Sequence, residues 1–214
     1  MKRACEPELL DSLPFDHPDA RRSRRDLRLI NLFMRNEARL GRVLPPLLRP
    51  GERVLELGAG TGELGLRLNA SGIPLDGLDL GPRPARWPRD REWHSGDLRA
   101  FSGYDRYAVV IGSLIFHHFT DAELGQLGDR LRSAARAVLA CEPTRRRVSQ
   151  RMIAAVAPLF GASHVTLHDA RVSIAAGFLG QELPLALGMR AGTWHFSCET
   201  TALGAFRMVA VRNP

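Results

Sequence analysis

The chain has 214 residues with 44% hydrophobic and 25% charged side chains, which suits one α/β domain with a sizeable core and leaves too little chain for two. The formal net charge is +7, but it comes from arginines spread along the chain rather than from a patch interleaved with aromatic residues, so nucleic acid is not the expected partner. Three cysteines without a C-x-x-C pair argue against a disulfide framework or zinc site, and the lack of a leader or of a ~20-residue apolar run predicts a cytoplasmic protein without a membrane span.

The first part of the chain, residues 1–49, is expected to form a helical segment ahead of the sheet. Its opening stretch contains three prolines and is expected to be irregular. Asp19 is placed to cap an amphipathic helix, which should continue, with a break near Gly41, until Pro45 and Pro46 stop it.

The stretch between Arg53 and Gly65 is the most informative part of the sequence. A short apolar run ending at Leu57 predicts a buried parallel strand, and the residues from Glu63 to about Asn69 predict a helix. Glycines stand at alternate positions between them. They let the backbone approach a ligand closely, and the free N–H groups of the first helical turn point at it. The pattern predicts a nucleotide-shaped binding site.

The kind of nucleotide is indicated by the carboxylate that precedes the glycines. Gly60 to Gly65 also fit the dinucleotide fingerprint G-x-G-x-x-G. Glu56, however, would repel a pyrophosphate and would favour the ammonium group of S-adenosylmethionine (SAM). The spacing Glu56-x-Gly58-x-Gly60-x-Gly62 closely resembles the first motif of class I SAM-dependent methyltransferases. A nicotinamide-dependent oxidoreductase, or a tight turn without a ligand, is the alternative.

Acidic residues follow the next two expected strands. Residues 73–79 predict strand two, and Asp79 at its tip is placed to accept hydrogen bonds from both ribose hydroxyls, in SAM and NAD enzymes alike. Residues 91–94 are a weak candidate for strand three, followed by Gly96 and Asp97. In the resembling family an acidic residue here contacts the adenine amino group. An equally good reading is that Asp97 only caps the turn that follows it.

The next block predicts a fourth strand at residues 108–112, a helix at 122–135 capped by Asp121, and a fifth strand at 137–141. A segment of the type Leu-x-His-His-Phe follows strand four. It resembles the branch of the family that methylates small molecules. No Asp/Asn-Pro-Pro-Tyr/Phe tetrapeptide follows strand four, which lowers the DNA-modifying alternative.

The rest of the chain divides into a lid and a hairpin. Residues 143–190, with helices expected at 148–160 and 181–187 around a loop at 162–169, have the position of a substrate lid in the resembling architecture. Residues 191–214 contain two alternating segments joined by a short turn, which predicts antiparallel strands. A closing antiparallel hairpin marks the class I methyltransferase fold, whereas a dinucleotide domain ends all-parallel.

Two histidines are the candidates for a general base, because histidine suits proton transfer at neutral pH. His117 follows strand four, whose carboxyl end faces the cofactor site by the crevice rule, and a hydrogen-bonded packing role is the alternative. His168 beside Asp169 in the lid is the second candidate. No metal is predicted, because His117 and His118 lack a third ligand at recognisable spacing.

Together these features predict a single Rossmann-like α/β domain with about seven strands, mostly parallel, closed by an antiparallel hairpin and covered by helices on both faces. Residues 50–142 form the SAM-binding core. The expected activity is SAM-dependent methylation of a small, rather apolar acceptor, with O-methylation of a phenolic or polyketide-like molecule preferred. The alternatives are an RNA or other macromolecule methyltransferase, an oxidoreductase and a non-catalytic SAM-binding protein. The oligomeric state is open.

The residues expected to contact SAM are Glu56, Gly58, Ala59, Gly60, Thr61, Gly62, Asp79, Leu80, Gly96, Asp97, Leu98, Ile111 and Gly112.

Overall fold

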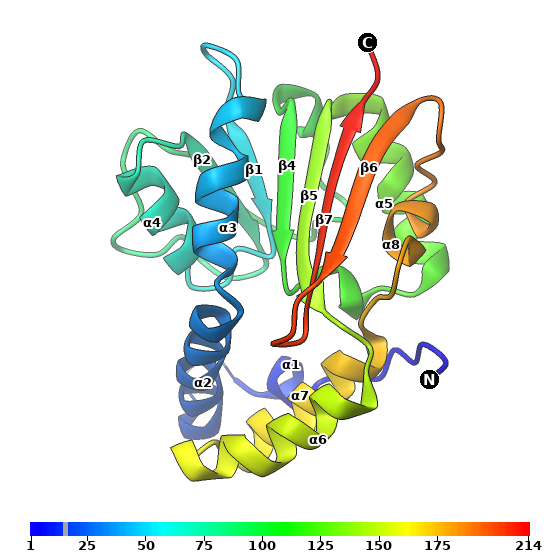
Figure 1. The fold of residues 1–214 in the computed structure, drawn as a ribbon. Helices are drawn as coiled ribbons and strands as arrows, with labels where there is room; N and C mark the ends of the chain where they lie inside the picture. The colour runs from blue at the N-terminus through cyan, green and yellow to red at the C-terminus, as the bar shows by residue number, and fades with distance from the viewer. Residues whose placement is uncertain (15–16) are drawn as a thin grey trace.

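The computed structural model describes residues 1–14 and 17–214, without the side chains of residues 27–33, 159 and 160. Within this part of the chain, seven strands form one sheet in the order β3-β2-β1-β4-β5-β7-β6 (Figure 1). The strands are β1 (Val54–Leu57), β2 (Leu75–Asp79), β3 (Trp93–Ser95), β4 (Val109–Ser113), β5 (Ala137–Pro143), β6 (Trp194–Thr200) and β7 (Ala205–Arg212). Strand β7 runs antiparallel to β5 and β6, and all other neighbouring strands are parallel. The predicted fold, including the closing hairpin, is confirmed.

The helices interrupt the strands in the expected alternation. They are α1 (Leu9–Ser12), α2 (Pro18–Met34), α3 (Asn36–Val43), α4 (Glu63–Ala70), α5 (Asp121–Ala134), α6 (Arg147–Val156), α7 (His164–Ala176) and α8 (Glu182–Ala186). Short 3₁₀ turns are η1 (Pro45–Leu47), η2 (Tyr104–Arg106), η3 (Phe116–His118) and η4 (Ala157–Phe160). None of the helices in the described part of the chain is long and apolar enough to cross a membrane.

Several local boundaries differ from the sequence-based expectations. The break in the N-terminal helix falls at Arg35, whose φ of 53° is left-handed, and not near Gly41. Thr120, not Asp121, caps α5, because its hydroxyl and the Glu123 carboxylate form a reciprocal capping box. Most of the expected loop at 162–169 is the first half of α7, which begins at His164 because the Ser163 side chain caps a helix there.

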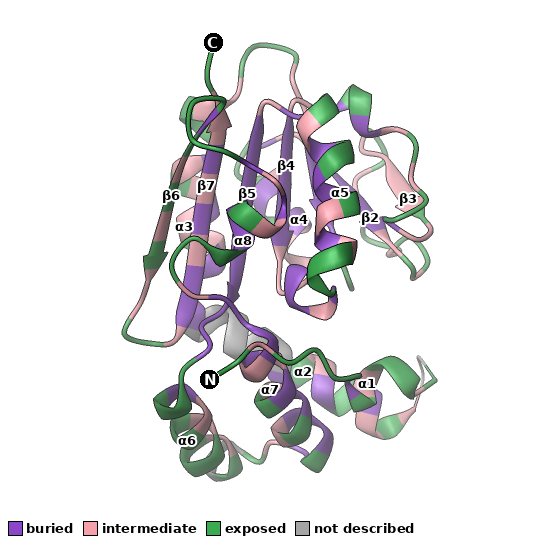
Figure 2. Ribbon diagram, turned by 90° about the vertical axis from the view of Figure 1, so that its right-hand side faces the viewer, coloured by how far each residue is buried: buried purple, intermediate pink, exposed green. Residues whose placement is uncertain are grey.

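Helices cover both faces of the sheet, as predicted. Helices α3 and α4 pack on one face, while α5 and α8 pack on the other (Figures 1 and 2). The central strands β1, β4 and β5 are buried almost throughout, apart from Ser113 at the end of β4. Strands buried on both faces have continuous apolar sequences, and for this reason they are easy to recognise in the sequence.

A separate group of helices lies below the carboxyl ends of the parallel strands. It consists of α1, α2, α6 and α7 and is called the helical cap here (Figure 1). The helical cap brings α1 and α2, which precede β1, together with α6 and α7, which follow β5. Asp26 of α2 accepts hydrogen bonds from the Thr166 hydroxyl at 2.8 Å and from the Ser163 N–H at 3.2 Å. The carboxyl ends of parallel strands are where open α/β sheets bind ligands, so the cap lies over the expected site.

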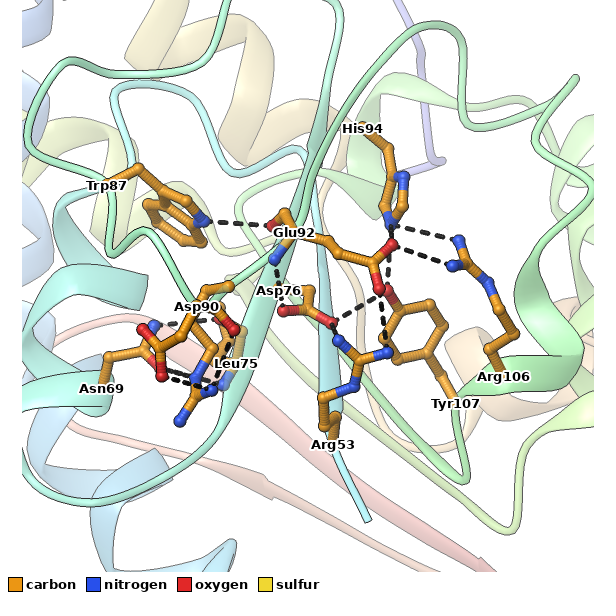
Figure 3. Close-up of polar contacts among 11 residues, drawn as sticks. Arg53, Asn69, Leu75, Asp76, Trp87, Asp90, Glu92, His94, Arg106 and Tyr107 are labelled. Carbon is orange, nitrogen blue, oxygen red and sulfur yellow. Dashed lines mark hydrogen bonds and ion pairs between the residues drawn. The ribbon is translucent and has the colours of Figure 1, made fainter. Parts of the chain in front are cut away.

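A polar network ties together strands β1, β2 and β3 (Figure 3). Asp76 of β2 is fully buried, forms an ion pair with Arg53 at 2.9 Å and accepts hydrogen bonds from the Glu92 N–H and the Tyr107 hydroxyl at 2.8 and 3.0 Å. The Glu92 carboxylate in turn pairs with Arg53 and Arg106. A buried carboxylate needs such partners, and these hold β2, which carries Asp79, in register with its neighbours.

Candidate cofactor and acceptor site

The glycine turn between β1 and α4 has the backbone that the sequence predicted. Gly58, Gly60 and Gly62 all have positive φ, at 63°, 57° and 76°. A Cβ on Gly58 would meet the Ile115 side chain at 2.6 Å, whereas a Cβ on Gly60 would meet nothing within 4 Å. Gly58 therefore serves close packing, and Gly60 lies open at the surface, with backbone that a ligand can approach.

Glu56 is the most unusual residue beside this turn. Its side chain is 3% exposed, and its Oε2 has no hydrogen-bond partner among the described residues. Burial, and then the nearby Asp79 carboxylate, raise the pKa of Glu56 to about 8, against a smaller opposing effect of the Gly65 N–H. An unpartnered buried carboxyl oxygen is costly, and a ligand's ammonium group would satisfy it. The site fits the α-amino group of SAM and not a pyrophosphate.

The tip of β2 presents a carboxylate and an apolar side chain next to each other. Asp79 accepts hydrogen bonds from the Gly60 and Gly81 N–H groups, both at 2.7 Å. Leu80 is 80% exposed. Burial lowers the pKa of Arg24, and the negative charge of Asp79 opposes this effect by raising it. The tip of β2 therefore lies near α2 of the helical cap, and the pair is suitable for a ribose and an adenine face.

The structure shows the turn-capping arrangement for Asp97. Its Oδ1 accepts the Arg99 N–H at 2.8 Å, and Arg99 also forms an ion pair with Oδ2 at 2.8 Å. Arg99 thereby lowers the pKa of Asp97. Gly96 donates its N–H to the Asp79 carbonyl at 2.8 Å, which brings the two expected contacts together. A contact between Asp97 and adenine stays a prediction.

The expected contact residues beyond β2 and the Gly96–Asp97 turn are packed into the interior. Leu98, Ile111 and Gly112 are buried, and Ile111 has no exposed surface at all. The Leu98 carbonyl accepts a hydrogen bond from the Tyr104 hydroxyl at 2.7 Å. The side chains of Leu98 and Ile111 belong to the two cores. A contact between SAM and these three residues stays a prediction.

The segment after β4 is held by a carboxylate that the sequence analysis did not single out. Glu142, at the end of β5, is fully buried and accepts the N–H groups of Ile115 and Phe116 at 3.0 and 2.9 Å. Leu114, just before them, has a left-handed φ of 59°, a strained conformation that surrounding contacts must maintain. The position of Glu142 at the carboxyl end of a strand was the signal that could have revealed it.

His117 does not have the surroundings of a free general base. The ring is 4% exposed, with Nδ1 at 2.6 Å from Glu142 and Nε2 at 3.3 Å from Glu8. Burial alone would lower its pKa, but the two carboxylates outweigh burial and raise the pKa of His117 to about 9. In this structure, without an ion, the two carboxylates therefore favour the protonated ring. A general-base role for His117 stays a prediction.

His168 lies on α7, with a half-exposed side chain and Nδ1 at 3.0 Å from Asp169. The Asp169 oxygens accept the N–H groups of Leu9 and Leu10 at 2.8 and 3.0 Å, so this carboxylate caps α1. The structure brings His168 and His117 onto contacting elements, α7 and η3. Its catalytic role stays a prediction.

Arg145, the first of three consecutive arginines at residues 145–147, is neither solvated nor free for a substrate. It is buried, and its guanidinium forms an ion pair with Glu182 at 2.5 Å and donates to the Gly177 carbonyl at 2.8 Å. The contact anchors α8 to the end of β5. The sequence could not show it because the partner is a distant residue.

Comparison with known proteins supports the fold. No protein-family model matches the sequence, and neither does any curated protein. Among solved structures, the plantazolicin methyltransferase BpumL, in complex with a pentazolic desmethylPZN analog and SAH, superposes with a TM-score of 0.71 and 12% identity over 94% of this chain and 93% of that one. Magnesium protoporphyrin IX methyltransferase (ChlM) from Synechocystis PCC 6803 with bound SAH gives 0.62 and 16% over 93% and 96%. The chain has the fold of class I SAM-dependent methyltransferases.

Proposed function

We propose that this protein is a SAM-dependent methyltransferase. The observation that carries the proposal is the buried Glu56 carboxyl group, which has an oxygen without a described partner beside an open glycine turn. The fold supports it, since the structural neighbours hold SAH or SAM. The antiparallel β7 also argues against a dinucleotide domain, because the sheet of such a domain ends in parallel strands.

The residues around the turn would bind and orient the cofactor rather than act chemically. SAM, when bound, supplies a methyl group on a sulfonium. Glu56 would hold the ammonium group, Asp79 the ribose hydroxyls, and Leu80 a face of the adenine. Methyl transfer needs the acceptor in line with the methyl group and water excluded. The helical cap is suited to both tasks, because α2 and α7 lie over the carboxyl ends of the strands.

The acceptor that we propose is a small, rather apolar molecule, methylated on oxygen as in a phenol or polyketide. The structural neighbours support a small acceptor. One was solved in complex with a desmethylPZN analog, and another is a magnesium protoporphyrin IX methyltransferase. Residues 143–190 serve as the substrate lid in this proposal, and the protein works in the cytoplasm without nucleic acid. A radiolabelled-SAM assay against phenols and RNA tests this part; labelling of RNA alone would contradict it.

The test of the cofactor is calorimetric titration of ligand-stripped protein with SAM, SAH and NADH. Micromolar binding of SAM and SAH without NADH is expected. Glu56→Gln should weaken SAM binding about tenfold or more, because it removes the charge that faces the ammonium. Glu37→Gln, at an exposed ion pair with Arg67, is the matched control. If NADH bound instead, and Glu56→Ala improved its binding, the oxidoreductase alternative would replace the proposal.

A further inference from the structure

Three potential metal ligands meet where the chain's beginning contacts the turn after β4. Glu8 precedes α1, and His117 and His118 belong to η3. One ligand atom from each of the three lies within 4.8 Å of the others. The sequence shows no third ligand at a recognisable spacing from the histidine pair. Glu8, which is 109 residues from His117, supplies one and removes the reason for excluding a metal.

The geometry of His117 is that of a metal-binding imidazole. Its Nδ1 lies 2.6 Å from the Glu142 carboxylate, while Nε2 points at Glu8. Histidines that bind metals almost always donate their other ring N–H to a carboxylate or carbonyl, which sets the tautomer and the ring orientation. Glu142 is itself held by the N–H groups of Ile115 and Phe116. The ring is thus fixed before any ion arrives.

The spacing of the His117 and Glu8 ligand atoms also suits one ion. Nε2 of His117 and Oε1 of Glu8 are 3.3 Å apart. Two atoms that each lie about 2.0–2.1 Å from a common ion are about 3.4 Å apart at the tetrahedral angle. Ser173 of α7 hydrogen-bonds the same Glu8 oxygen, which orients the carboxylate.

Charge and access favour a cation at this position. Two buried carboxylates, Glu8 and Glu142, flank the His117 ring, so one negative charge is left over away from water even when that ring is protonated. Such a surplus is unfavourable unless a cation balances it. His118 has a side chain that is 26% exposed, and Asp11 lies 3.5 Å from its Nδ1. This ring therefore gives an ion a route from solvent.

We propose that Glu8, His117 and His118 bind one divalent first-row transition-metal ion, with Zn²⁺ or Fe²⁺ as the chemical class. Two imidazoles and one carboxylate suit these ions, whereas Mg²⁺ and Ca²⁺ prefer sets made only of oxygen. Three protein ligands leave positions for water or a substrate oxygen, and a bound hydroxyl loses its proton more readily. That use for the acceptor rests on the proposed function; the metal binding itself does not.

The test is titration of metal-stripped, full-length protein with Zn²⁺ and Co²⁺, followed by calorimetry and by the visible d–d spectrum of Co²⁺. We expect one ion per chain, displaced by chelator and not competed by millimolar Mg²⁺. His118→Ala and Glu8→Gln should each weaken Zn²⁺ binding at least tenfold. Glu142→Gln should weaken it about 10–100-fold through its contact with the other nitrogen of His117. His195→Ala, on β6, is the matched control, and circular dichroism verifies folding of each variant.

Two results would overturn the proposal. One is a folded wild-type protein that binds neither Zn²⁺ nor Co²⁺ stoichiometrically. The other is stoichiometric binding that His118→Ala and Glu8→Gln leave unchanged, which would assign the ion to other residues. SAM titration of the same samples is independent of both, so failure of the metal site and failure of the proposed methyltransferase activity give different results.

Discussion

Glu56 and His117 show how burial decides the chemistry of individual residues. Burial makes the Glu56 carboxyl group a weaker acid, with a pKa of about 8, and two carboxylates make the His117 ring a stronger base, with a pKa of about 9. Because the native state holds the Glu56 proton more tightly than the unfolded chain, its contribution to stability is full below the ordinary pKa of 4.5. It is lost as the pH rises toward about 8, by at most about 1.4 kcal/mol per pH unit.

The raised pKa of Glu56 predicts that SAM binding releases a proton at pH 7. The free carboxyl group is mostly protonated there, and pairing with the ammonium favours the ionised form. Calorimetry in phosphate and in Tris should give different binding enthalpies. The difference should be nearly the full difference between the ionisation enthalpies of the two buffers, because nearly one proton is released for each SAM bound. The difference should vanish in Glu56→Gln and in wild type well above pH 8. Equal enthalpies in the two buffers at pH 7 would show that Glu56 does not change its charge.

The glycines of the turn predict different effects for the same substitution. Gly58→Ala places a Cβ 2.6 Å from Ile115. It should therefore destabilise the fold by more than the roughly 1–2 kcal/mol that a left-handed backbone costs an alanine. Gly60→Ala meets open space and should show only that backbone effect, yet weaken SAM binding. Urea unfolding and SAM titration of both variants separate these effects. Unchanged SAM affinity in a folded Gly60→Ala would place the ligand elsewhere.

At the scale of elements, the buried network around Asp76 sets the position of β2 and hence of Asp79. Asp76→Ala leaves Arg53, the Glu92 N–H and the Tyr107 hydroxyl without their shared acceptor. We expect a loss of about 2–4 kcal/mol in the free energy of unfolding.

The control for the network is Asp90→Ala, which removes an exposed ion pair with Arg91 and should change stability by less than about 1 kcal/mol. Urea unfolding measures both variants. Equal effects would mean that the network does not stabilise the fold. A weakened SAM affinity in Asp76→Ala at pH 7, under conditions where the variant is folded, would show that the network also positions Asp79.

At the scale of the whole molecule, the helical cap is tied together across the sequence by Asp26. This buried carboxylate joins α2 to Thr166 and Ser163 at the start of α7. Asp26→Ala should loosen the cap while the sheet stays folded, since the two cores lie on the faces of the sheet. The missing acceptor should destabilise the cap by about 1–3 kcal/mol.

Hydrogen–deuterium exchange tests this expectation. Faster exchange in α2 and α7, with unchanged exchange in β4 and β5, is the expected pattern, together with weaker SAM binding. Asp19→Ala, on the more exposed first turn of α2, is the control. Faster exchange throughout the molecule would show instead that the cap and the sheet unfold as one unit.

The order of strands and helices was predictable because its signals are local. Strands buried on both faces appear as apolar runs, and the strained glycine turn needs glycine at three positions. The hairpin of β6 and β7 followed from alternation and a short turn in the same way. The predictions of the N-cap residue of α5 and of the start of α7 were wrong. Neighbouring residues such as Thr120 and Asp121 can both act as an N-cap, and only the backbone conformation decides between them.

By itself, the sequence determined the class I methyltransferase fold and the glycine turn with its acidic neighbour, because both depend on residues close together in the chain. Only the tertiary structure decided which side chains meet. Glu8 reaches His117 and Asp26 reaches Thr166 across more than half of the chain's length. It also decided the directions in which the pKa values of His117 and Glu56 shift, because a pKa depends on burial and on neighbours from distant segments, for which a linear pattern of residues contains no signal.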